Sequence, residues 1–575
     1  MKLLALLRTG LSSLYQSVKR FPLTIFLTTV TTVLLIIISR ADGVTTLETL
    51  TRLAMVTALG IPATLSIALA FERTKTARAV KFGSYALAFC LLALYYIFLL
   101  PEFGMVTITR YIAITLAFYL AFLFAPYFFR RPGFEMYVIK VINRFLVAGI
   151  YSAILFAGLA LTLLTIDLLL GIEVSFTFYS NVWLVVAGVF APCFFLAGLP
   201  AIDQDMAEEN YPTVLKVLLL YIVMPIILTY TLILYIYFLK TLLTLKWPEG
   251  TVSHLVLWYS VFSAGVIFLV YPLERNNKFV QFFTAWFPKL VLPAIIVMFM
   301  AIAVRINAYG VTENRYFVVA LGLWVLGVML YYSLTKHFKN IVLPVSLALV
   351  ALLTVFGPWS AYSVSTYSQN ARFETLATEY NMVNGNTLQK PDREISLEDK
   401  KAIISILEYF ERSHSLSAIR LLPPNFELQN METVFGFSRE DIWAIPGRQK
   451  YFHLHTQVKS LEVRDYDHLL KSDNLRQESV AVGPLTVKYS PEDLKLVVVR
   501  GDQELYARNL QIFAEQVVER HGAISLELPV QDMTFAEENE ILKIRFVFTG
   551  ITGNDEASQI TFENLEFYLL LKFEQ

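Results

Sequence analysis

The chain has 575 residues, of which 56% are hydrophobic and 16% are charged, and its formal net charge is zero. Soluble domains contain about 45–50% apolar residues, so the excess here excludes an entirely soluble protein and indicates membrane segments. Residues 1–360 carry 25 Lys and Arg against 14 Asp and Glu, whereas residues 361–575 carry 22 against 33, and this acidic balance argues against nucleic-acid binding by the C-terminal part.

Eleven apolar stretches occupy the first 360 residues. A bilayer core about 30 Å thick needs about 20 apolar residues per helix. The predicted spans are residues 21–39, 53–71, 84–100, 106–128, 145–168, 181–199, 217–239, 252–273, 289–304, 316–334 and 341–360. We therefore predict a polytopic α-helical membrane bundle of about 11 transmembrane helices (residues 1–360), followed by a C-terminal α+β soluble domain with an antiparallel sheet (residues 361–575).

The loops between these spans differ in positive charge. One set of alternate loops carries 18 Lys and Arg, and the other set carries 7. The positive-inside rule assigns the richer set to the cytoplasm. The N-terminus is therefore expected inside, and an odd number of spans leaves the C-terminal domain outside. The first span lacks a small-residue cleavage site, so we expect it to remain as a signal anchor.

Prolines fall within five of the predicted spans, at Pro62, Pro192, Pro225, Pro293 and Pro344. Each proline frees a backbone carbonyl and can kink its helix. Broken helices around a substrate site, as in transporters, would explain this pattern. Ordinary helix packing also explains it, because proline is commoner in membrane helices than in soluble ones.

Ionisable residues are scarce at bilayer depth, where function is first sought in a membrane protein. The nearest to mid-span lie close to the outer ends of the spans: Arg110, Asp167, His254, Arg305 and Arg315. This scarcity counts against a proton- or sodium-coupled transporter. Side chains that snorkel to the interface are the alternative explanation for each of these residues.

The outer loop from Arg305 to Arg315 is the most suggestive stretch, because it also contains Tyr309, Gly310 and Glu313. Its two arginines could bind a phosphate or carboxylate headgroup bidentately. Alternatively, Thr312 caps the next helix and Glu313 favours its positive end. Both interpretations stay open. The candidate binding residues are Arg305, Tyr309, Glu313, Arg315, Arg110 and His254.

Five separate segments carry a family resemblance: Arg20–Leu27, Phe190–Pro200, Trp247–Ser260, Arg305–Val318 and Phe356–Leu376. Together they resemble the bacterial membrane family called domain of unknown function 4153. The resemblance implies a multi-pass protein of the bacterial inner membrane, whose outer domain would be periplasmic. The resemblance implies no catalytic residues at any position of this sequence.

After Trp359 the sequence becomes polar. A helix is predicted over Ser368–Met382, and a capping box at Ser396–Asp399 opens a second helix, Leu397–Arg412. Alternating apolar residues then predict strands over residues 452–458, 485–489, 494–499, 523–528, 541–548 and 560–573, with one helix at Asn509–Glu519.

Chemical motifs are sparse in this soluble part. His453 and His455 share one face of a strand at a spacing compatible with metal binding, but no third ligand is fixed, so they are weak candidates and no metal or cofactor is expected. Both cysteines, Cys90 and Cys193, fall inside predicted spans. The sequence contains none of the common nucleophile, phosphate-loop or dinucleotide patterns.

Three classes of function fit this organisation. We favour a non-enzymatic protein that transports, binds or handles a lipid-like or anionic solute, with membrane lipids as partners and no nucleic acid. An envelope scaffold or sensor is the first alternative, with a periplasmic protein or small molecule as the candidate partner of the outer domain. The second alternative is a transferase acting on a lipid-linked donor. Such enzymes need carboxylates in a first outer loop that is usually long, whereas here that loop is short and contains only Asp42 and Glu48.

Overall fold

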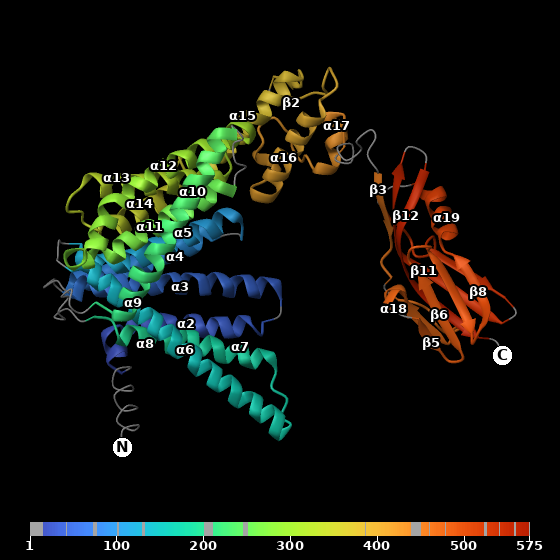
Figure 1. The fold of residues 1–575 in the computed structure, drawn as a ribbon, viewed down its shortest axis with the longest axis horizontal. Helices are drawn as coiled ribbons and strands as arrows, with labels where there is room; N and C mark the ends of the chain where they lie inside the picture. The colour runs from blue at the N-terminus through green and yellow to red at the C-terminus, as the bar shows by residue number, and fades with distance from the viewer. Residues whose placement is uncertain are drawn as a thin grey trace. The chain divides into compact units, whose positions relative to one another are not determined.

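The structure is a computed structural model, which describes residues 15–41, 43–72, 78–100, 103–128, 133–200, 211–244, 251–385, 387–438, 450–458, 460–477, 479–522, 526–539, 541–556 and 559–573. The chain divides into two compact units, whose elements are labelled in Figure 1. The first comprises Met1–Leu388 with Ser405–Phe426, and the second comprises Gln389–Ile404 with Glu427–Gln575.

Apolar helices make up most of the first unit. Among the described residues, 9 helices are long and apolar enough to cross a membrane, and 2 more apolar helices are shorter. Each predicted span overlaps one of these helical segments, so the chain is a multi-pass membrane protein. They are α2 (Pro22–Ile38), α3 (Val44–Glu72), α4 (Arg78–Leu99), α5 (Met105–Phe124) with η1 (Ala125–Tyr127), α6 (Phe134–Leu170), α7 (Phe176–Val185) with η2 (Val186–Phe190) and α8 (Ala191–Ala197), α9 (Thr213–Val217) with η4 (Leu218–Val223) and α10 (Met224–Thr244), α11 (Thr251–Val270) with η5 (Tyr271–Asn276), α12 (Lys278–Tyr309), α13 (Glu313–Leu334) and α14 (Val342–Val355).

Two of the five prolines in the predicted spans lie just after irregular helical turns. The segments η2 and η4 are π-helical turns, and each is followed closely by a proline, Pro192 or Pro225. A proline lacks the N–H that would bond the carbonyl four residues earlier. The carbonyls left without that donor belong to Gly188 and Tyr221, which lie inside the two π turns. The missing donors therefore account for where the helices widen.

A polar helical segment completes the first unit. Helix α15 (Ala361–Glu379) begins seven residues before the predicted Ser368, because Ser360 caps it through a bond from the Ser363 N–H. The short hairpin β1–β2 (Val383–Asn384, Thr387–Leu388), the end of α16 (Leu397–Ser413) and η6 (Leu416–Ala418) follow. The predicted cap of α16 is confirmed, since Ser396 Oγ accepts from the Asp399 N–H at 3.1 Å.

The second unit is built from two β-sheets, and apart from the β3–β9 pair their strands are antiparallel, as predicted. One sheet has the order β4-β12-β11-β3-β9, with β10 also paired to β11, and the other has the order β5-β6-β7-β8. The strands are β3 (Lys450–His455), β4 (His468–Lys471), β5 (Val480–Val482), β6 (Leu485–Ser490), β7 (Lys495–Arg500), β8 (Gln503–Asn509), β9 (Leu526–Glu527), β10 (Thr534–Glu538), β11 (Leu542–Glu556) and β12 (Gln559–Phe573); the helical pieces are η7 (Leu428–Asn430), α17 (Met431–Phe435), α18 (Ser472–Gln477) and α19 (Gln511–His521).

One buried cluster joins the two sheets to helix α19. In β6 and β7 alternate residues are buried, among them Val487 and Val498, because successive side chains point to opposite faces of a strand. These residues pack in the same cluster as Phe513 of α19 and Phe546 and Phe567 of the other sheet. The unit is thus an α+β structure with its own hydrophobic core.

Candidate functional site

The loop between α12 and α13 has its backbone polar groups bonded by side chains from other elements. Helix α12 ends at Gly310, whose φ of +69° lies in the region that favours glycine. The carbonyl of Tyr309 accepts from Arg315 Nη1 and from Gln369 Nε2, both at 3.0 Å. The Val311 N–H donates to Ser368 Oγ at 2.9 Å. Helix α15 and the first turn of α13 therefore hold this loop in one conformation.

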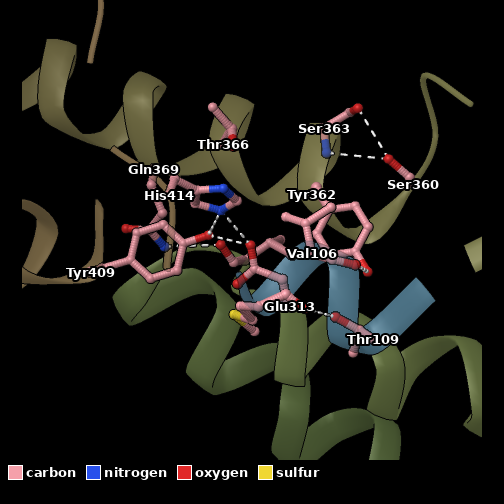
Figure 2. A network of polar contacts seen from close by, with 12 residues as sticks. Val106, Thr109, Glu313, Ser360, Tyr362, Ser363, Thr366, Gln369, Tyr409 and His414 are labelled. Atoms are coloured by element: carbon pink, nitrogen blue, oxygen red, sulfur yellow. Dashed lines mark hydrogen bonds and ion pairs between the residues drawn. The ribbon is translucent and has the colours of Figure 1, made fainter. Parts of the chain in front are cut away.

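A buried carboxylate lies directly after this loop, at the first residue of α13 (Figure 2). Glu313 is only 1% exposed, and its Oε1 contacts Tyr409 Oη at 2.6 Å and His414 Nε2 at 2.7 Å. Tyr409 Oη and His414 Nε2 lie 3.0 Å apart. We call these three residues the Glu313 cluster. Tyr409 comes from the end of α16 and His414 from the residue after it, so the cluster fastens that segment to α13.

Hydrogen-bond chemistry fixes where the protons of the cluster lie. An ionised carboxylate only accepts, so the Tyr409 hydroxyl donates to Glu313 and His414 carries a proton on Nε2. Burial, followed by the hydrogen bond to the Glu313 carboxylate, raises the pKa of Tyr409 well above its usual range. A charged side chain this deeply buried needs hydrogen-bond donors in place of water, and Tyr409 and His414 supply them to Glu313.

The residues predicted from the sequence fall in four places. Glu313, Tyr309 and Arg315 come together around the loop, and the Arg315 guanidinium lies 5.5 Å from the centre of the Tyr309 ring. Arg305 is exposed on the last turns of α12. Arg110 of α5 donates to the Val355 carbonyl at 3.3 Å.

Arg110 also belongs to the surroundings of the cluster. Its guanidinium lies 5.4 Å from the ring of Tyr362, whose side chain appears beside Glu313 in Figure 2. His254 is half-buried on α11 and forms none of the contacts described here. Thr312 occupies the N-cap position of α13, but its side chain makes no capping hydrogen bond. Asp42 lies outside the described residues.

Sequence reasoning missed the two partners of Glu313. Tyr409 and His414 follow it by 96 and 101 residues, Tyr409 inside the predicted helix Leu397–Arg412 and His414 just after it. A buried polar pairing across such a separation leaves no local pattern. The only signal was the acidic residue itself at the outer end of an apolar run.

A second feature of the first unit is a cavity of about 620 Å³ among α2, α3, α5, α6 and the α7–η2–α8 segment, which we call the α2–α6 cavity. Ligand pockets usually measure about 300–1,000 Å³. Apolar and small side chains dominate its wall. Phe145 and Trp183 on the wall are 66% and 44% exposed, so the cavity opens to the surroundings of the bundle.

The threonine and serine hydroxyls of the cavity wall have partners within the protein. Thr28 and Thr32 donate to carbonyls of their own helix at 2.8 Å each. Thr31 donates to the hydroxyl of Thr57 at 3.0 Å, and Ser152 donates to the Ala148 carbonyl at 2.7 Å. A bonded hydroxyl presents mainly its carbon atoms, so this space suits an apolar occupant.

One end of the cavity is bordered by charged side chains. Arg20, at the start of α2, forms a two-bonded ion pair with Glu72 (2.7 and 2.9 Å) and also donates to the carbonyls of Leu199 and Pro200. Arg144 of α6 is exposed, and its Cδ lies 2.9 Å from where a Cβ of Gly198 would stand. The lack of a side chain at Gly198 thus gives Arg144 its place beside α8.

The two histidines of β3 stand side by side, with ring centres 5.1 Å apart. Within the part of the chain that the structure describes, no group of three or more His, Cys, Asp or Glu residues could hold a metal ion.

Comparison with known proteins gives a family but no activity. The family model described as Domain of unknown function (DUF4153) matches residues 23–384. The chain is similar to an uncharacterized protein of Pasteurella multocida (strain Pm70), at 26% identity over 262 residues, which are 44% of this chain and 43% of that protein. The chain thus spans less than half the length of that curated relative. No solved structure matches.

Proposed function

We propose that this chain, which belongs to the family described as Domain of unknown function (DUF4153), is a membrane protein that binds and handles lipid-like molecules rather than catalysing a reaction. The α2–α6 cavity is the observation that carries this proposal. Its volume, its apolar wall and its threonine and serine hydroxyls, which are bonded to neighbouring protein groups, match a hydrocarbon chain better than a polar solute.

The proposed placement is an inner-membrane protein with eleven spans, a cytoplasmic N-terminus and a periplasmic C-terminal unit. The loop charges, 18 against 7, support this orientation. Helices α2 and α14 have 17 and 14 residues, or about 25 and 21 Å, and are short for a core of about 30 Å. Local thinning of the bilayer accommodates such helices at modest cost. A reporter fused after Gln575 that is active only in the periplasm is the expected result, and cytoplasmic activity would contradict it.

The cavity offers a matched pair of variants that tests the lipid-binding role. Gly149 and Gly158 both lie on α6, and a Cβ at either would meet nothing within 4 Å. Only Gly149 lines the cavity. We expect Gly149→Phe to fill the space without a clash, while Gly158→Phe adds the same side chain outside it.

The measurement is the amount of lipid that stays bound to the purified full-length chain, counted by native mass spectrometry. Wild type and Gly158→Phe should retain lipid, and Gly149→Phe should lose most of it at equal expression and equal unfolding temperature. Equal retention by all three proteins would overturn lipid binding in this cavity and would favour the scaffold or sensor role.

A further inference from the structure

The cavity has a definite length along its walls. On α2 the lining residues run from Thr24 to Leu35, and on α6 they run from Val141 to Ser152. Each run advances eleven residues, or about 16 Å at 1.5 Å per residue. A hydrocarbon core about 30 Å thick gives each leaflet about 15 Å. The cavity is therefore about as long as the acyl chain of one lipid, and on the short helix α2 it extends over 12 of the 17 residues.

The two ends of the cavity differ in charge. At the end where α2 begins and α8 finishes, Arg20 is neutralised by the Glu72 carboxylate. Arg144 is exposed at the same end, and it lies on the face of α6 that Val141 and Ala148 share, three residues before and four after it. Both of those residues line the cavity. A guanidinium thus stands at the mouth of an apolar slot.

We propose that the α2–α6 cavity holds one acyl chain of an anionic phospholipid and that Arg144 binds the headgroup phosphate. This inference rests on the proposed lipid-binding function and adds to it the lipid class and the residue that selects it. An arginine presents paired N–H donors that match phosphate geometry, and its charge favours a headgroup that carries net negative charge. The positively charged end is also the end that the loop charges assign to the cytoplasmic leaflet.

The geometry also explains why the headgroup would come to this end. At the opposite end the wall is formed by Leu35, three residues before the end of α2, and Trp183 of α7, which present an apolar surface. Neither side chain carries a positive charge, so a phosphate placed beside them would lack the charged partner that Arg144 offers at the first end. The occupant is therefore oriented as well as held.

The test compares phosphatidylglycerol with phosphatidylethanolamine of identical acyl chains, added in equal amounts to delipidated full-length protein and scored by native mass spectrometry. Both lipids carry the phosphate, but in phosphatidylethanolamine the headgroup ammonium cancels its charge and repels Arg144, so wild type should prefer phosphatidylglycerol severalfold. Arg144→Gln should bind both lipids alike, and Arg144→Lys should recover part of the preference. Lys278→Gln, which removes an exposed positive charge from α12 outside the cavity, should behave as wild type.

The possible failures are distinguishable. If Arg144→Gln keeps the full preference for phosphatidylglycerol, the headgroup assignment is wrong while lipid binding stands. If Lys278→Gln loses the preference as Arg144→Gln does, general surface charge selects the lipid and the assignment to Arg144 is wrong. If wild type binds neither lipid, or Gly149→Phe binds both as wild type does, the proposed function fails together with this inference.

Discussion

Replacing Glu313 with alanine removes the acceptor that Tyr409 and His414 share at 2.6 and 2.7 Å. Tyr409 is 7% exposed, and the His414 side chain is 11% exposed, so water replaces the lost carboxylate poorly. A buried donor without a partner costs about 1–3 kcal/mol, so two such donors cost about 2–6 kcal/mol. We expect Glu313→Ala to destabilise the first unit by that amount, and Asn314→Ala, an exposed neighbour on the same helix, to change stability by less than about 0.5 kcal/mol.

The assay is the apparent unfolding temperature of the full-length chain in detergent, for Glu313→Ala, Tyr409→Phe and the double variant. Residues in one hydrogen-bond network give non-additive effects, typically about 0.5–3 kcal/mol of coupling. The double variant should therefore be less destabilised than the sum of the single variants. Strictly additive shifts, or a Glu313→Ala protein as stable as Asn314→Ala, would refute the idea that the cluster fastens α13 to the end of α16.

Three further predictions concern other parts of the chain. Gly310→Ala should lower the free energy of unfolding by about 1–3 kcal/mol, because φ is +69° and Gln369 Nε2 lies only 2.8 Å from the new Cβ. Gly104→Ala is the control, since nothing lies within 4 Å of its Cβ. Equal unfolding temperatures for the two variants would contradict the prediction. Because folding raises the pKa of Tyr409, the stability that its hydroxyl contributes should be complete below the ordinary phenol pKa of about 10 and should fall above it. The difference in unfolding temperature between wild type and Tyr409→Phe should therefore shrink from pH about 8 to pH about 11. A constant difference would contradict this prediction. Phe546→Ala in the sheet core, where the side chain is 0% exposed, should lower the stability of the second unit by about 3–5 kcal/mol. Leu469→Ala, at 47% exposure, should change it little. Resistance of the second unit to protease measures both effects.

Much of the architecture could be predicted because lipid imposes a simple rule. Each apolar run of about 20 residues must become a helix, since no other single segment satisfies its own backbone in hydrocarbon. Alternation likewise predicted β6 and β7, whose buried residues Val487 and Val498 repeat with period two. Strand pairing could not be predicted, because no local sequence pattern in β11 indicates that β3, β10 and β12 all pair with it.

The candidate site was predictable only in part. Glu313 and Arg315 stood out as charges at the end of an apolar run, but their roles depend on distant groups. Arg315 Nη1 bonds backbone carbonyls of the loop at 3.0 and 2.6 Å, and Glu313 pairs with residues about a hundred positions away. The prolines were more informative than the sequence alone suggested, since Pro192 and Pro225 mark the two π turns.

Polar bonding around helix α2 is uneven, and under the proposed lipid-binding role this predicts where a lipid would enter. The Arg20–Glu72 pair, just before α2, and the Thr24–Thr64 hydroxyl contact at 3.1 Å join α2 to α3, and the C-terminal end of α2 is joined to α7 through Ser39 and Asn181 at 3.2 Å. Beyond Ser152, α6 instead meets α7 through aromatic contact such as Phe156 on Trp183, and its neighbouring side chain Ile154 is 65% exposed. Ring contacts slide at little cost, whereas hydroxyl and ion-pair contacts must break. If the α2–α6 cavity holds lipid as proposed, we expect the lipid to enter between α6 and α7, while α2 and α3 stay in place.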